Sequence, residues 1–468
     1  MTTSQPFDLI VIGGGPAGEK GAAQAAYFGK RVALVEREAW FGGAAVNTGT
    51  VPSKTLRETA LYFSGLRQRG LYGIDYSLRD NLTVGDFLHH TEAVIGEQRR
   101  LIAENIARHQ VTVFRGEGSF LDARTIEVRS SAPAPQRLSA PVILIATGSS
   151  PLRPADIPFD DRIVYDSDSI LRMDRIPRTL AVIGGGVIGS EYASIFTALG
   201  VKVTLIDGRD RLLPFADHDI VARLQQRLEM LGQRFVLGAK VATTERHEDG
   251  VRLTLGTGEV IEAERALFAA GRQSNVEGLA LEKAGVTMGK RGLIPVDAHY
   301  CTNVTGVYAA GDVIGFPALA STSMEQARVA MVHAFDLGYK ERMSAVLPLA
   351  VYTVPELGMV GLTEEEARAK EDAVEVGRAE YARNARAQII GDQSGLLKLV
   401  FRVEDKQLLG VHIVGELASE LVHVGAEVVR TGGTIDAFID AVYNWPSLSD
   451  CYKYAAYDGL GALKRRMG

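Results

Sequence analysis

Two glycine patterns are the parts of the sequence best suited to bind a cofactor that contains a pyrophosphate. The first consists of Gly13, Gly15 and Gly18, and Glu36 follows 23 residues after its first glycine. Such glycines allow a tight turn, a close approach of pyrophosphate to the backbone, and close packing of a helix whose N-terminus favours anions. The acid is placed to bind a ribose diol. This pattern predicts a dinucleotide site.

The same pattern occurs again later in the chain. Gly184, Gly186 and Gly189 are followed by Asp207, again 23 residues after the first glycine. Two sites in one chain indicate two dinucleotides, and a flavin with a nicotinamide is a pair that exchanges a hydride.

Charged residues beyond the second pattern suggest how it chooses between nicotinamides. Asp207 favours a free 2′-hydroxyl, whereas Arg209 and Arg211 are placed to pair with a 2′-phosphate. The segment therefore predicts that one pocket accepts both NAD(H) and NADP(H). The alternative interpretation is a charged surface turn.

The elements around the glycines must place them at the end of a strand and the start of a helix. Residues 7–12 and 31–36 are continuous apolar runs, typical of parallel strands buried on both faces, and residues 16–28 are rich in alanine, as in a helix. Residues 179–207 repeat this arrangement. Each pattern therefore lies in a predicted βαβ unit.

The rest of the chain predicts further elements. We expect a long helix at residues 84–109 and a small β insertion at residues 111–145, with an exposed loop at residues 130–135. The end of another buried strand is expected at residues 309–312. The C-terminal region should alternate strands at residues 398–403 and 408–414 with helices at residues 416–430 and 448–464. Crossovers between domains are expected at residues 151–158 and 275–292.

Composition excludes several classes of protein. The 468 residues carry a net charge of −6, so no basic footprint for nucleic acid or anionic lipid is present. Cys301 and Cys451 lie far apart and form no CxxC pair, which excludes a disulfide scaffold and a thiolate zinc site. Residues 1–8 lack an export signal, and no apolar run approaches ~20 residues. We expect a cytoplasmic protein that binds small molecules.

Three further segments carry a family resemblance. Ala146-Thr147-Gly148, Gly271-Arg272 and Tyr308-Ala-Ala-Gly-Asp312-Val313 resemble fingerprints of the two-dinucleotide flavoprotein disulfide reductases. The resemblance implies FAD on the first βαβ unit with Asp312 on its ribityl chain, and NAD(P) on the second. It also implies an α/β fold of two Rossmann-like domains with a C-terminal α+β dimerisation domain, and at least a homodimer. The expected segments are FAD-binding residues 1–150 and 278–345, NAD(P)-binding residues 151–277, and dimerisation residues 346–468.

The chain lacks the sulfur chemistry of that family. Ala45 and Thr50 stand where the reductases have their two redox cysteines, and neither can form a disulfide. Trp445 stands where they have a histidine, and indole has no titratable nitrogen near neutral pH. Dithiol substrates are therefore disfavoured.

The hydride side of the family pattern is retained. Lys54 and Glu191 match the family's ion pair beside flavin N5. Residues 47–58 closely resemble the soluble, Si-specific pyridine nucleotide transhydrogenases. We therefore expect FAD-dependent hydride transfer between NADPH and NAD⁺ in a ping-pong order, the physiological direction remaining open. An NAD(P)H:quinone or dye reductase is the alternative enzyme, and a non-catalytic redox sensor is the alternative of another class.

The predicted site residues fall into three groups. The catalytic residues are Lys54 and Glu191. The FAD-binding residues are Gly13, Gly15, Gly18, Glu36, Arg37, Gly43, Ala45, Thr50, Gly118, Thr147, Gly148, Gly311, Asp312 and Ala320. The NAD(P)-binding residues are Gly184, Gly186, Val187, Ile188, Glu191, Asp207, Arg209 and Gly271.

The remaining polar and sulfur residues have simpler expected roles. No metal ligand is assigned. We expect His89 and His90 to be solvated, His412 and His423 to be core residues, and Cys451 to be a buried, inert thiol.

Overall fold

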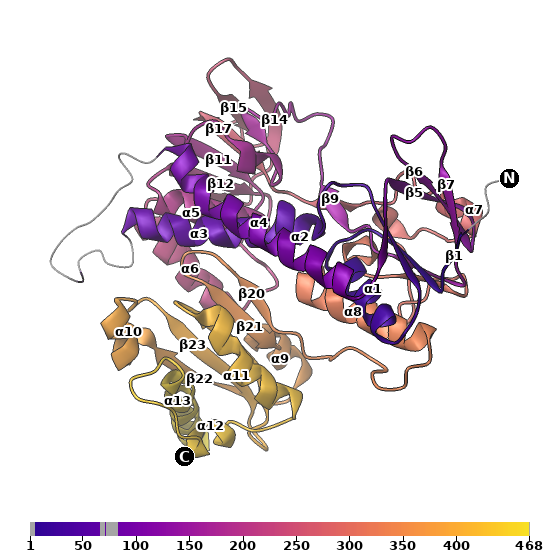
Figure 1. The fold of residues 1–468 in the computed structure, drawn as a ribbon. Coiled ribbons are helices and arrows are strands. Elements are labelled where there is room, and N and C mark those ends of the chain that lie inside the picture. The colour runs from indigo at the N-terminus through magenta and orange to yellow at the C-terminus, as the bar shows by residue number, and fades with distance from the viewer. Residues whose placement is uncertain (1–4, 66–70, 72–82, 468) are drawn as a thin grey trace. The chain divides into compact units, whose positions relative to one another are not determined.

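The chain divides into two structural units in a computed structural model that describes residues 5–65, 71 and 83–467 (Figure 1). The first unit comprises Met1–Thr55, His89–Leu152 and Gly271–Ser344, and the second comprises Leu56–Leu88, Arg153–Ala270 and Ala345–Gly468. The four domain segments expected from the sequence stay a prediction.

The first unit is built on a five-stranded parallel sheet. Its strand order is β19-β8-β2-β3-β4, with β2 (Leu9–Ile12), β3 (Val32–Glu36), β4 (Thr112–Arg115), β8 (Val142–Ile145) and β19 (Val307–Ala309). Every residue of β2, β3 and β8 is buried, which is the environment that continuous apolar runs require. The winding direction reverses between β2 and β8, and ligands of doubly wound sheets bind at such a point.

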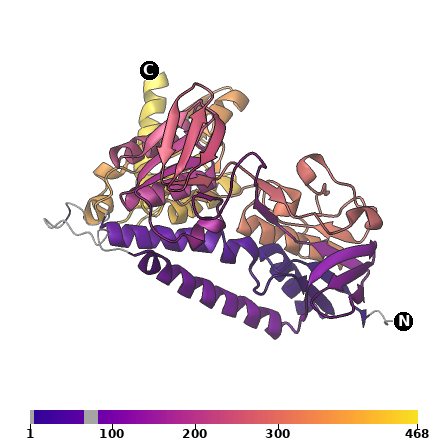
Figure 2. The same ribbon diagram turned by 90° about the horizontal axis from the view of Figure 1, so that it is seen from above.

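Small residues allow the helices of this unit to pack closely. Helix α1 (Pro16–Tyr27) lies against α8 (Ala320–Ala334). A Cβ on Gly21 would lie 2.5 Å from Leu144 and 3.5 Å from Ala327, so a larger residue would have to displace the Leu144 side chain. The remaining helices are α2 (Gly43–Asn47), α7 (Leu281–Ala284), and parts of α3 (Thr50–Ser64) and of α4 (Val84–Arg108), the long purple helix of Figure 2.

Two small sheets complete the first unit. One has the order β1-β7-β6-β5, with β1 (Gln5–Pro6), β5 (Glu117–Asp122), β6 (Thr125–Arg129) and β7 (Gln136–Ser139). The other pairs β9 (Ser149–Pro151) with β18 (Arg272–Ser274). Residues 130–135 are exposed between β6 and β7, as the sequence predicts.

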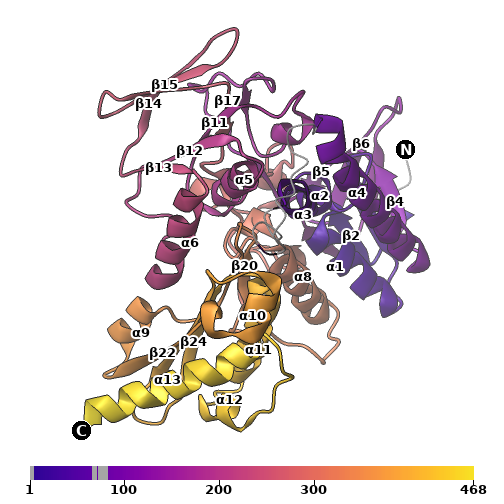
Figure 3. The same ribbon diagram turned by 90° about the vertical axis from the view of Figure 1, so that its left-hand side faces the viewer.

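The second unit repeats the parallel architecture. Its sheet has the order β10-β17-β11-β12-β13, and helices α5 (Val187–Ala198) and α6 (His218–Met230) follow β11 and β12 (Figure 3). The strands are β10 (Val164–Tyr165), β11 (Thr179–Ile183), β12 (Lys202–Asp207), β13 (Arg234–Leu237) and β17 (Arg265–Phe268). An antiparallel sheet of β14 (Val241–Arg246), β15 (Val251–Leu255) and β16 (Val260–Ala263) is inserted before β17.

The C-terminal part of the second unit contains an antiparallel sheet of order β20-β21-β24-β23-β22. Its strands are β20 (Leu349–Val351), β21 (Leu357–Gly361), β22 (Val374–Glu380), β23 (Leu396–Arg402) and β24 (Leu408–Val414). The helices are α9 (Glu364–Lys370), α10 (Ala385–Ile390), α11 (Ala418–Arg430), α12 (Asp436–Asp440) and α13 (Asp450–Met467). Short 3-10 turns occur in both units. They lie at Lys290–Gly292 and Asp312–Ile314 in the first unit and at Ser169–Arg172 and Tyr381–Arg383 in the second.

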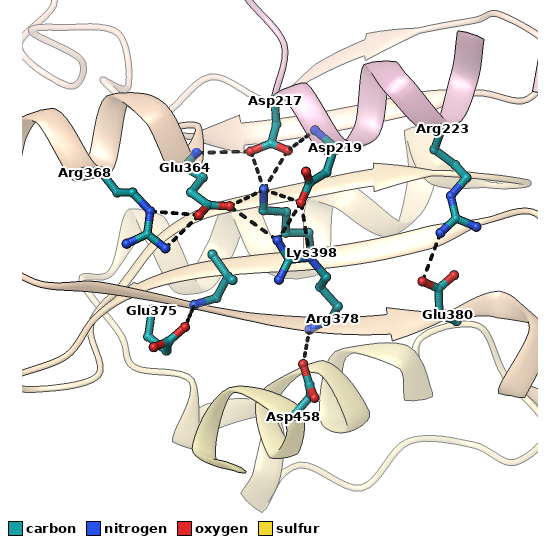
Figure 4. A network of polar contacts seen from close by, with 11 residues as sticks. Asp217, Asp219, Arg223, Glu364, Arg368, Glu375, Arg378, Glu380, Lys398 and Asp458 are labelled. Atoms are coloured by element: carbon teal, nitrogen blue, oxygen red, sulfur yellow. Dashed lines mark hydrogen bonds and ion pairs between the residues drawn. The ribbon is translucent and has the colours of Figure 1, made fainter. Parts of the chain in front are cut away.

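Alternation along β23 separates an apolar face from a charged one. Leu397, Leu399 and Phe401 share a buried cluster with residues of α11 and α13. Because successive strand residues point to opposite faces, Lys398 projects to the other side. There its Nζ lies 2.9 Å from Asp217 and 3.0 Å from Asp219 (Figure 4).

Lys398 is the centre of a buried ion cluster with Asp217, Asp219 and Glu364. Lys398 and Asp217 are both almost fully buried, and the Glu364 carboxylate lies 2.6 Å from the ammonium. Burial disfavours the charged form of Asp219, but its bonds to Arg378 and Lys398 outweigh this and hold its pKa at about 2. The cluster joins α6 to β23 and α9.

Most predicted elements are confirmed, and one residue is not. The predicted helix at residues 84–109 is α4, the strand at 408–414 is β24, and His412 is fully buried. His423 is exposed on α11, so the expectation that it lies in the core was wrong. Apolar neighbours in sequence misled here, because on an amphipathic helix adjacent residues face different sides. Within the described residues, no helix has both the length and the apolar character needed to cross a bilayer.

Candidate functional site

The first glycine loop brings helix α1 onto strand β2 at backbone contact distance. Gly13 has φ +102°, and a Cβ there would lie 2.4 Å from the carbonyl oxygen of Ala146. A Cβ on Gly18 would lie 1.8 Å from the carbonyl oxygen of Gly13. Gly15 caps the N-terminus of α1. Gly13 and Gly18 are therefore sterically required, and the loop leaves the amides of the first helical turn facing the end of β2.

Glu36 closes this loop from the neighbouring strand. Its Oε2 accepts a hydrogen bond from the Gly14 amide at 2.6 Å, and its Oε1 accepts one from the Glu38 amide at 2.8 Å. The buried carboxylate is thus fixed beside the helix N-terminus, where a ribose diol attached to a pyrophosphate is expected to lie.

The second glycine loop repeats this geometry. Gly184 has φ +111°, and a Cβ on Gly189 would lie 1.8 Å from the Gly184 carbonyl oxygen. The Gly185 amide donates to Asp207 Oδ2 at 2.5 Å, as the Gly14 amide does to Glu36. Gly186 caps α5, and no described atom lies within 4 Å of the place where its Cβ would stand. Val187 and Ile188 form the first turn of α5.

The surroundings of the first loop fit FAD. A Cβ on Gly43 would lie 2.9 Å from Gly15 Cα, and the Gly42 amide donates to the Gly14 carbonyl at 2.8 Å, so a second backbone segment lines the loop. Thr147 Oγ1 is buried without a hydrogen-bond partner among the described residues. A cavity of about 510 Å³ beside Glu36 is lined by Arg37, Arg115, Arg129, Glu38, Gly116, Glu117, Ser130 and Ser131.

Asp312 lies after β19 in the same unit and is held by residues that the sequence analysis did not assign. Ser149 Oγ donates to Asp312 Oδ2 at 2.6 Å, and Arg272 Nε donates to Ser149 Oγ at 2.8 Å. The Gly311 amide donates to Gln326 Oε1 on α8. Ser149 directly follows the Ala146–Gly148 fingerprint and Arg272 is part of the Gly271-Arg272 fingerprint, so their position in the sequence was the available signal.

The other predicted FAD residues occupy several places in the first unit. Ala45 lies in α2, Thr50 begins α3, Gly148 has φ +68° after β8, and Ala320 begins α8. Gly118 lies in β5, where a Cβ would be 3.2 Å from Val35 and 3.3 Å from Ile12, so the structure gives it a packing role. Contact of these residues with the cofactor stays a prediction.

The two proposed catalytic residues belong to different units, Lys54 to the first and Glu191 to the second. Lys54 lies on α3, and its Nζ donates to Ser53 Oγ at 3.2 Å. Glu191 lies on α5 and is buried, and its Oε1 accepts a hydrogen bond from the Tyr352 amide at 2.9 Å. Glu191 is therefore no solvated surface residue, whereas its pairing with Lys54 stays a prediction.

Asp207 and Arg209 form a two-pronged ion pair at the second site. Arg209 Nε lies 2.8 Å from Asp207 Oδ1, and Arg209 Nη2 lies 2.6 Å from Oδ2. Burial disfavours the charged form of Asp207, but these bonds outweigh it and hold the pKa of Asp207 below its usual value. Arg211 instead donates to the Pro214 carbonyl. Gly271, also predicted here, belongs to the first unit and accepts from the Leu152 amide.

The two thiols of the chain are poorly ionised. Burial raises the pKa of Cys451 to about 12 and also raises the pKa of Cys301. Cys451 is buried, as expected. Among the residues that the structure describes, no group of three or more His, Cys, Asp and Glu side chains is arranged to hold a metal ion.

Comparisons with known proteins agree with the two-site geometry. The family model described as pyridine nucleotide-disulphide oxidoreductase matches residues 7–334, and the model of that family's dimerisation domain matches residues 347–456. The chain belongs to this family. The family resemblance found in the sequence and the predicted α/β fold are therefore confirmed, and the protein is an oxidoreductase that uses FAD with pyridine nucleotides.

Individual relatives extend over the whole chain. The protein named soluble pyridine nucleotide transhydrogenase from Mycobacterium tuberculosis is 44% identical over 459 residues, which cover 98% of each chain. The protein of the same name from Colwellia psychrerythraea is 39% identical and covers 99% of this chain and 100% of its own. Among solved structures, LpdA from Mycobacterium tuberculosis has a TM-score of 0.89 at 30% identity and covers 98% of this chain and 99% of its own. The flavoprotein disulfide reductase RclA from Escherichia coli has a TM-score of 0.86 at 26% identity, covering 96% of this chain and 99% of its own.

The glycine contacts predict separable losses of the two nucleotides. Gly18→Ala places a methyl group against the Gly13 carbonyl, so we expect the purified chain to retain less than roughly a tenth of its FAD. Gly189→Ala should keep FAD but weaken NADPH binding at least about tenfold, which corresponds to ~1.4 kcal/mol. Flavin absorbance per chain and equilibrium titration with NADPH measure the two effects.

Gly96→Ala is the matched control, because Gly96 lies in the interior of α4 and its Cβ would meet nothing within 4 Å. It should bind both nucleotides normally. Normal FAD content in Gly18→Ala would contradict the steric argument.

Proposed function

We propose that the chain transfers a hydride between NADPH and NAD⁺ through bound FAD, in a ping-pong order and without a redox disulfide. One observation carries the proposal. Both dinucleotide loops are complete, while Ala45 and Thr50 occupy the two positions at which the family's disulfide reductases have sulfur. The names of the full-length relatives support the same reaction.

The residues of this chain would bind and orient the reactants. FAD, when bound, supplies an isoalloxazine ring whose N5 accepts and returns a hydride. Lys54 and Glu191 are proposed to set the charge beside that position. Because a hydride moves without a proton, no protein acid or base is required, and the rate gain comes from holding the reacting atoms about 3 to 3.5 Å apart.

The ping-pong order follows from the number of sites. The sequence contains one glycine loop of this type besides the loop proposed for FAD, so NADP⁺ must leave the Gly184–Gly189 region before NAD⁺ enters. Asp207 and Arg209 would serve both nucleotides there. The half-exposed guanidinium can leave Asp207 for a 2′-phosphate, whereas a free ribose diol needs only the carboxylate.

The C-terminal region supports a proposed homodimer. It matches the dimerisation model, and Val442 and Trp445 are 95% and 77% exposed. Large apolar side chains that face solvent mark interaction surfaces when they cluster. Cytoplasmic localisation stays a prediction.

Anaerobic half-reactions test the proposed function directly. The flavin of the purified protein is reduced with one equivalent of NADPH, NADP⁺ is removed, and NAD⁺ is added. We expect rapid oxidation of the flavin together with stoichiometric formation of NADH, both measured by absorbance. If the reduced flavin persists in the presence of NAD⁺ but is promptly reoxidised by a quinone, the protein is a quinone reductase instead. If NADPH fails to reduce the flavin, the result indicates the non-catalytic redox sensor.

Removing Arg209 should separate the two nicotinamides. In Arg209→Ala the 2′-phosphate loses its cationic partner and faces an unpaired Asp207, so we expect KM for NADPH to rise roughly 10- to 100-fold, equivalent to ~1.4–2.8 kcal/mol. KM for NADH should change less than about threefold. Arg252→Ala removes an exposed guanidinium of β15 and serves as the control. Equal effects on both nucleotides would remove this assignment.

Replacement of both cysteines should leave the reaction intact. We expect the double variant C301A/C451A to keep its transhydrogenation rate within about threefold, because no thiol takes part. Reductive titration of the wild-type protein should consume about two electrons per flavin, since no disulfide adds to the flavin's capacity. Uptake of about four electrons, or loss of activity in a double variant that retains FAD, would contradict the sulfur-free mechanism.

A further inference from the structure

The segment of residues 352–356, between β20 and β21, contacts the helix that carries Glu191. The Tyr352 amide donates to Glu191 Oε1 at 2.9 Å, and the Val354 amide donates to Ser194 Oγ at 3.2 Å. Ser194 in turn donates to the Glu191 carbonyl at 2.8 Å. The segment therefore fixes both the Glu191 side chain and the adjoining part of α5.

The same segment is bound by an arginine of α3. Arg57 follows Lys54 by three residues, so the two lie on neighbouring turns of one helix. Arg57 Nε donates to the Thr353 carbonyl at 2.8 Å, and its Nη1 lies 3.1 Å from Glu356 Oε1. Glu58 accepts a further bond from Nη1 at 2.5 Å. Both ends of the segment are thus tied to α3.

Glu356 connects this arginine to the C-terminal region. Its Oε2 accepts hydrogen bonds from the Ser419 amide at 3.1 Å and from Ser419 Oγ at 2.7 Å, at the start of α11. A carboxylate beside a helix N-terminus is stabilised by the unpaired amides of the first turn. Glu356 is therefore itself held rigidly, and it gives Arg57 a fixed partner.

The burial of Arg57 indicates a role beyond stability. Its side chain is almost fully buried, and its Nη2 has no hydrogen-bond partner among the described residues. Desolvating a guanidinium is costly, and a well-packed apolar side chain of similar volume is often neutral or better for stability. We therefore explain the buried and incompletely bonded Arg57 by the position that its bonds impose on residues 352–356.

We propose that Arg57 is a positioning residue for hydride transfer. Through the Thr353 carbonyl and Glu356 it holds residues 352–356 in place, and the Tyr352 amide of that segment orients the Glu191 carboxylate. The bonds of Arg57 go to Thr353, Glu356 and Glu58. The inference rests on the proposed role of Glu191 beside the flavin, and it adds a structural cause for the orientation of that carboxylate.

The Lys398 cluster supplies a matched control within the same unit. Lys398 is as deeply buried as Arg57 and likewise joins carboxylates of separate elements, but its bonds go to Asp217, Asp219 and Glu364 (Figure 4). Lys398→Met should therefore leave buried carboxylates without their cation, as Arg57→Met should leave Glu356, without disturbing residues 352–356.

The first measurement is the limiting rate of flavin reduction by NADPH in the FAD-loaded enzyme under anaerobic stopped-flow conditions. We expect Arg57→Met to lower this rate roughly 10- to 100-fold, with the Kd of NADPH changed less than about threefold, because misplacement of about 1 Å has effects of this size. Arg57→Lys, which keeps the charge but not the fork of donors, should be impaired to an intermediate degree. Lys398→Met should stay within about threefold of wild type.

The second measurement is hydrogen–deuterium exchange of the same proteins, which does not depend on turnover. The amides of Tyr352 and Val354 should exchange faster in Arg57→Met and Arg57→Lys than in wild type, but not in Lys398→Met. If Arg57→Met fails to fold with FAD, Arg57→Lys and Glu356→Gln carry the test. Unchanged exchange at these amides, or equal rate losses in the Arg57 and Lys398 variants, would overturn the proposal.

This test is separate from that of the proposed function. Flavin reduction by NADPH requires no NAD⁺, so a wild-type enzyme that reduces its flavin but forms no NADH overturns transhydrogenation alone. The role of Arg57 is then still decided by the reduction rate and by amide exchange.

Discussion

The contact between a glycine of the helix and a carbonyl oxygen of the loop is the constraint on which both nucleotide sites depend. A Cβ on Gly18 or Gly189 would approach that oxygen to 1.8 Å, so the helix can pack this closely only where no side chain exists. Close packing in turn aims the unpaired amides of the helix N-terminus at the end of the central strand. The other contacts of the two loops, including the hydrogen bonds to the carboxylates of Glu36 and Asp207, depend on this close packing of helix against loop.

The two sites differ in how their acids are satisfied, and this difference suits different nucleotides. Among the described residues, the Glu36 carboxylate accepts from the backbone amides of Gly14 and Glu38, which suits the proposed site of a cofactor that stays bound. Asp207 is held partly by the half-exposed side chain of Arg209. A 2′-phosphate would offer this guanidinium another anionic partner, so the ion pair can be exchanged for a contact with substrate. Under the proposed mechanism, one scaffold would hold a permanent ligand at one copy and an exchanging ligand at the other.

The repeated βαβ pattern made the fold predictable from the sequence. The contacts that support the proposed site could not be predicted in this way. Each βαβ unit has its apolar runs, glycines and acid within about 30 residues, so local rules sufficed to predict the unit. The bonds from Arg57 to Thr353 join positions nearly 300 residues apart, and no local pattern encodes them. One signal was available: Arg57 lies on the same helical stripe as Ala60 and Leu61, both buried, and a charge there implies a partner. His423 shows the opposite error, since apolar neighbours alone do not specify which face of a helix a residue occupies.

Lys398 and Arg57, two buried cations of the second unit, differ in how completely their hydrogen-bond donors are bonded, and we relate this difference to their roles. Lys398 has three carboxylate partners for its three donors, so its desolvation is offset within the cluster. Arg57 is as buried, but its Nη2 has no partner among the described residues, and both of its bonded nitrogens contact the five-residue segment 352–356. A cluster selected only for stability would tend to complete its bonds or lose the charge. Arg57 is better explained if selection acted on where that segment lies, because its amides fix the one buried carboxylate that the hydride site is expected to need.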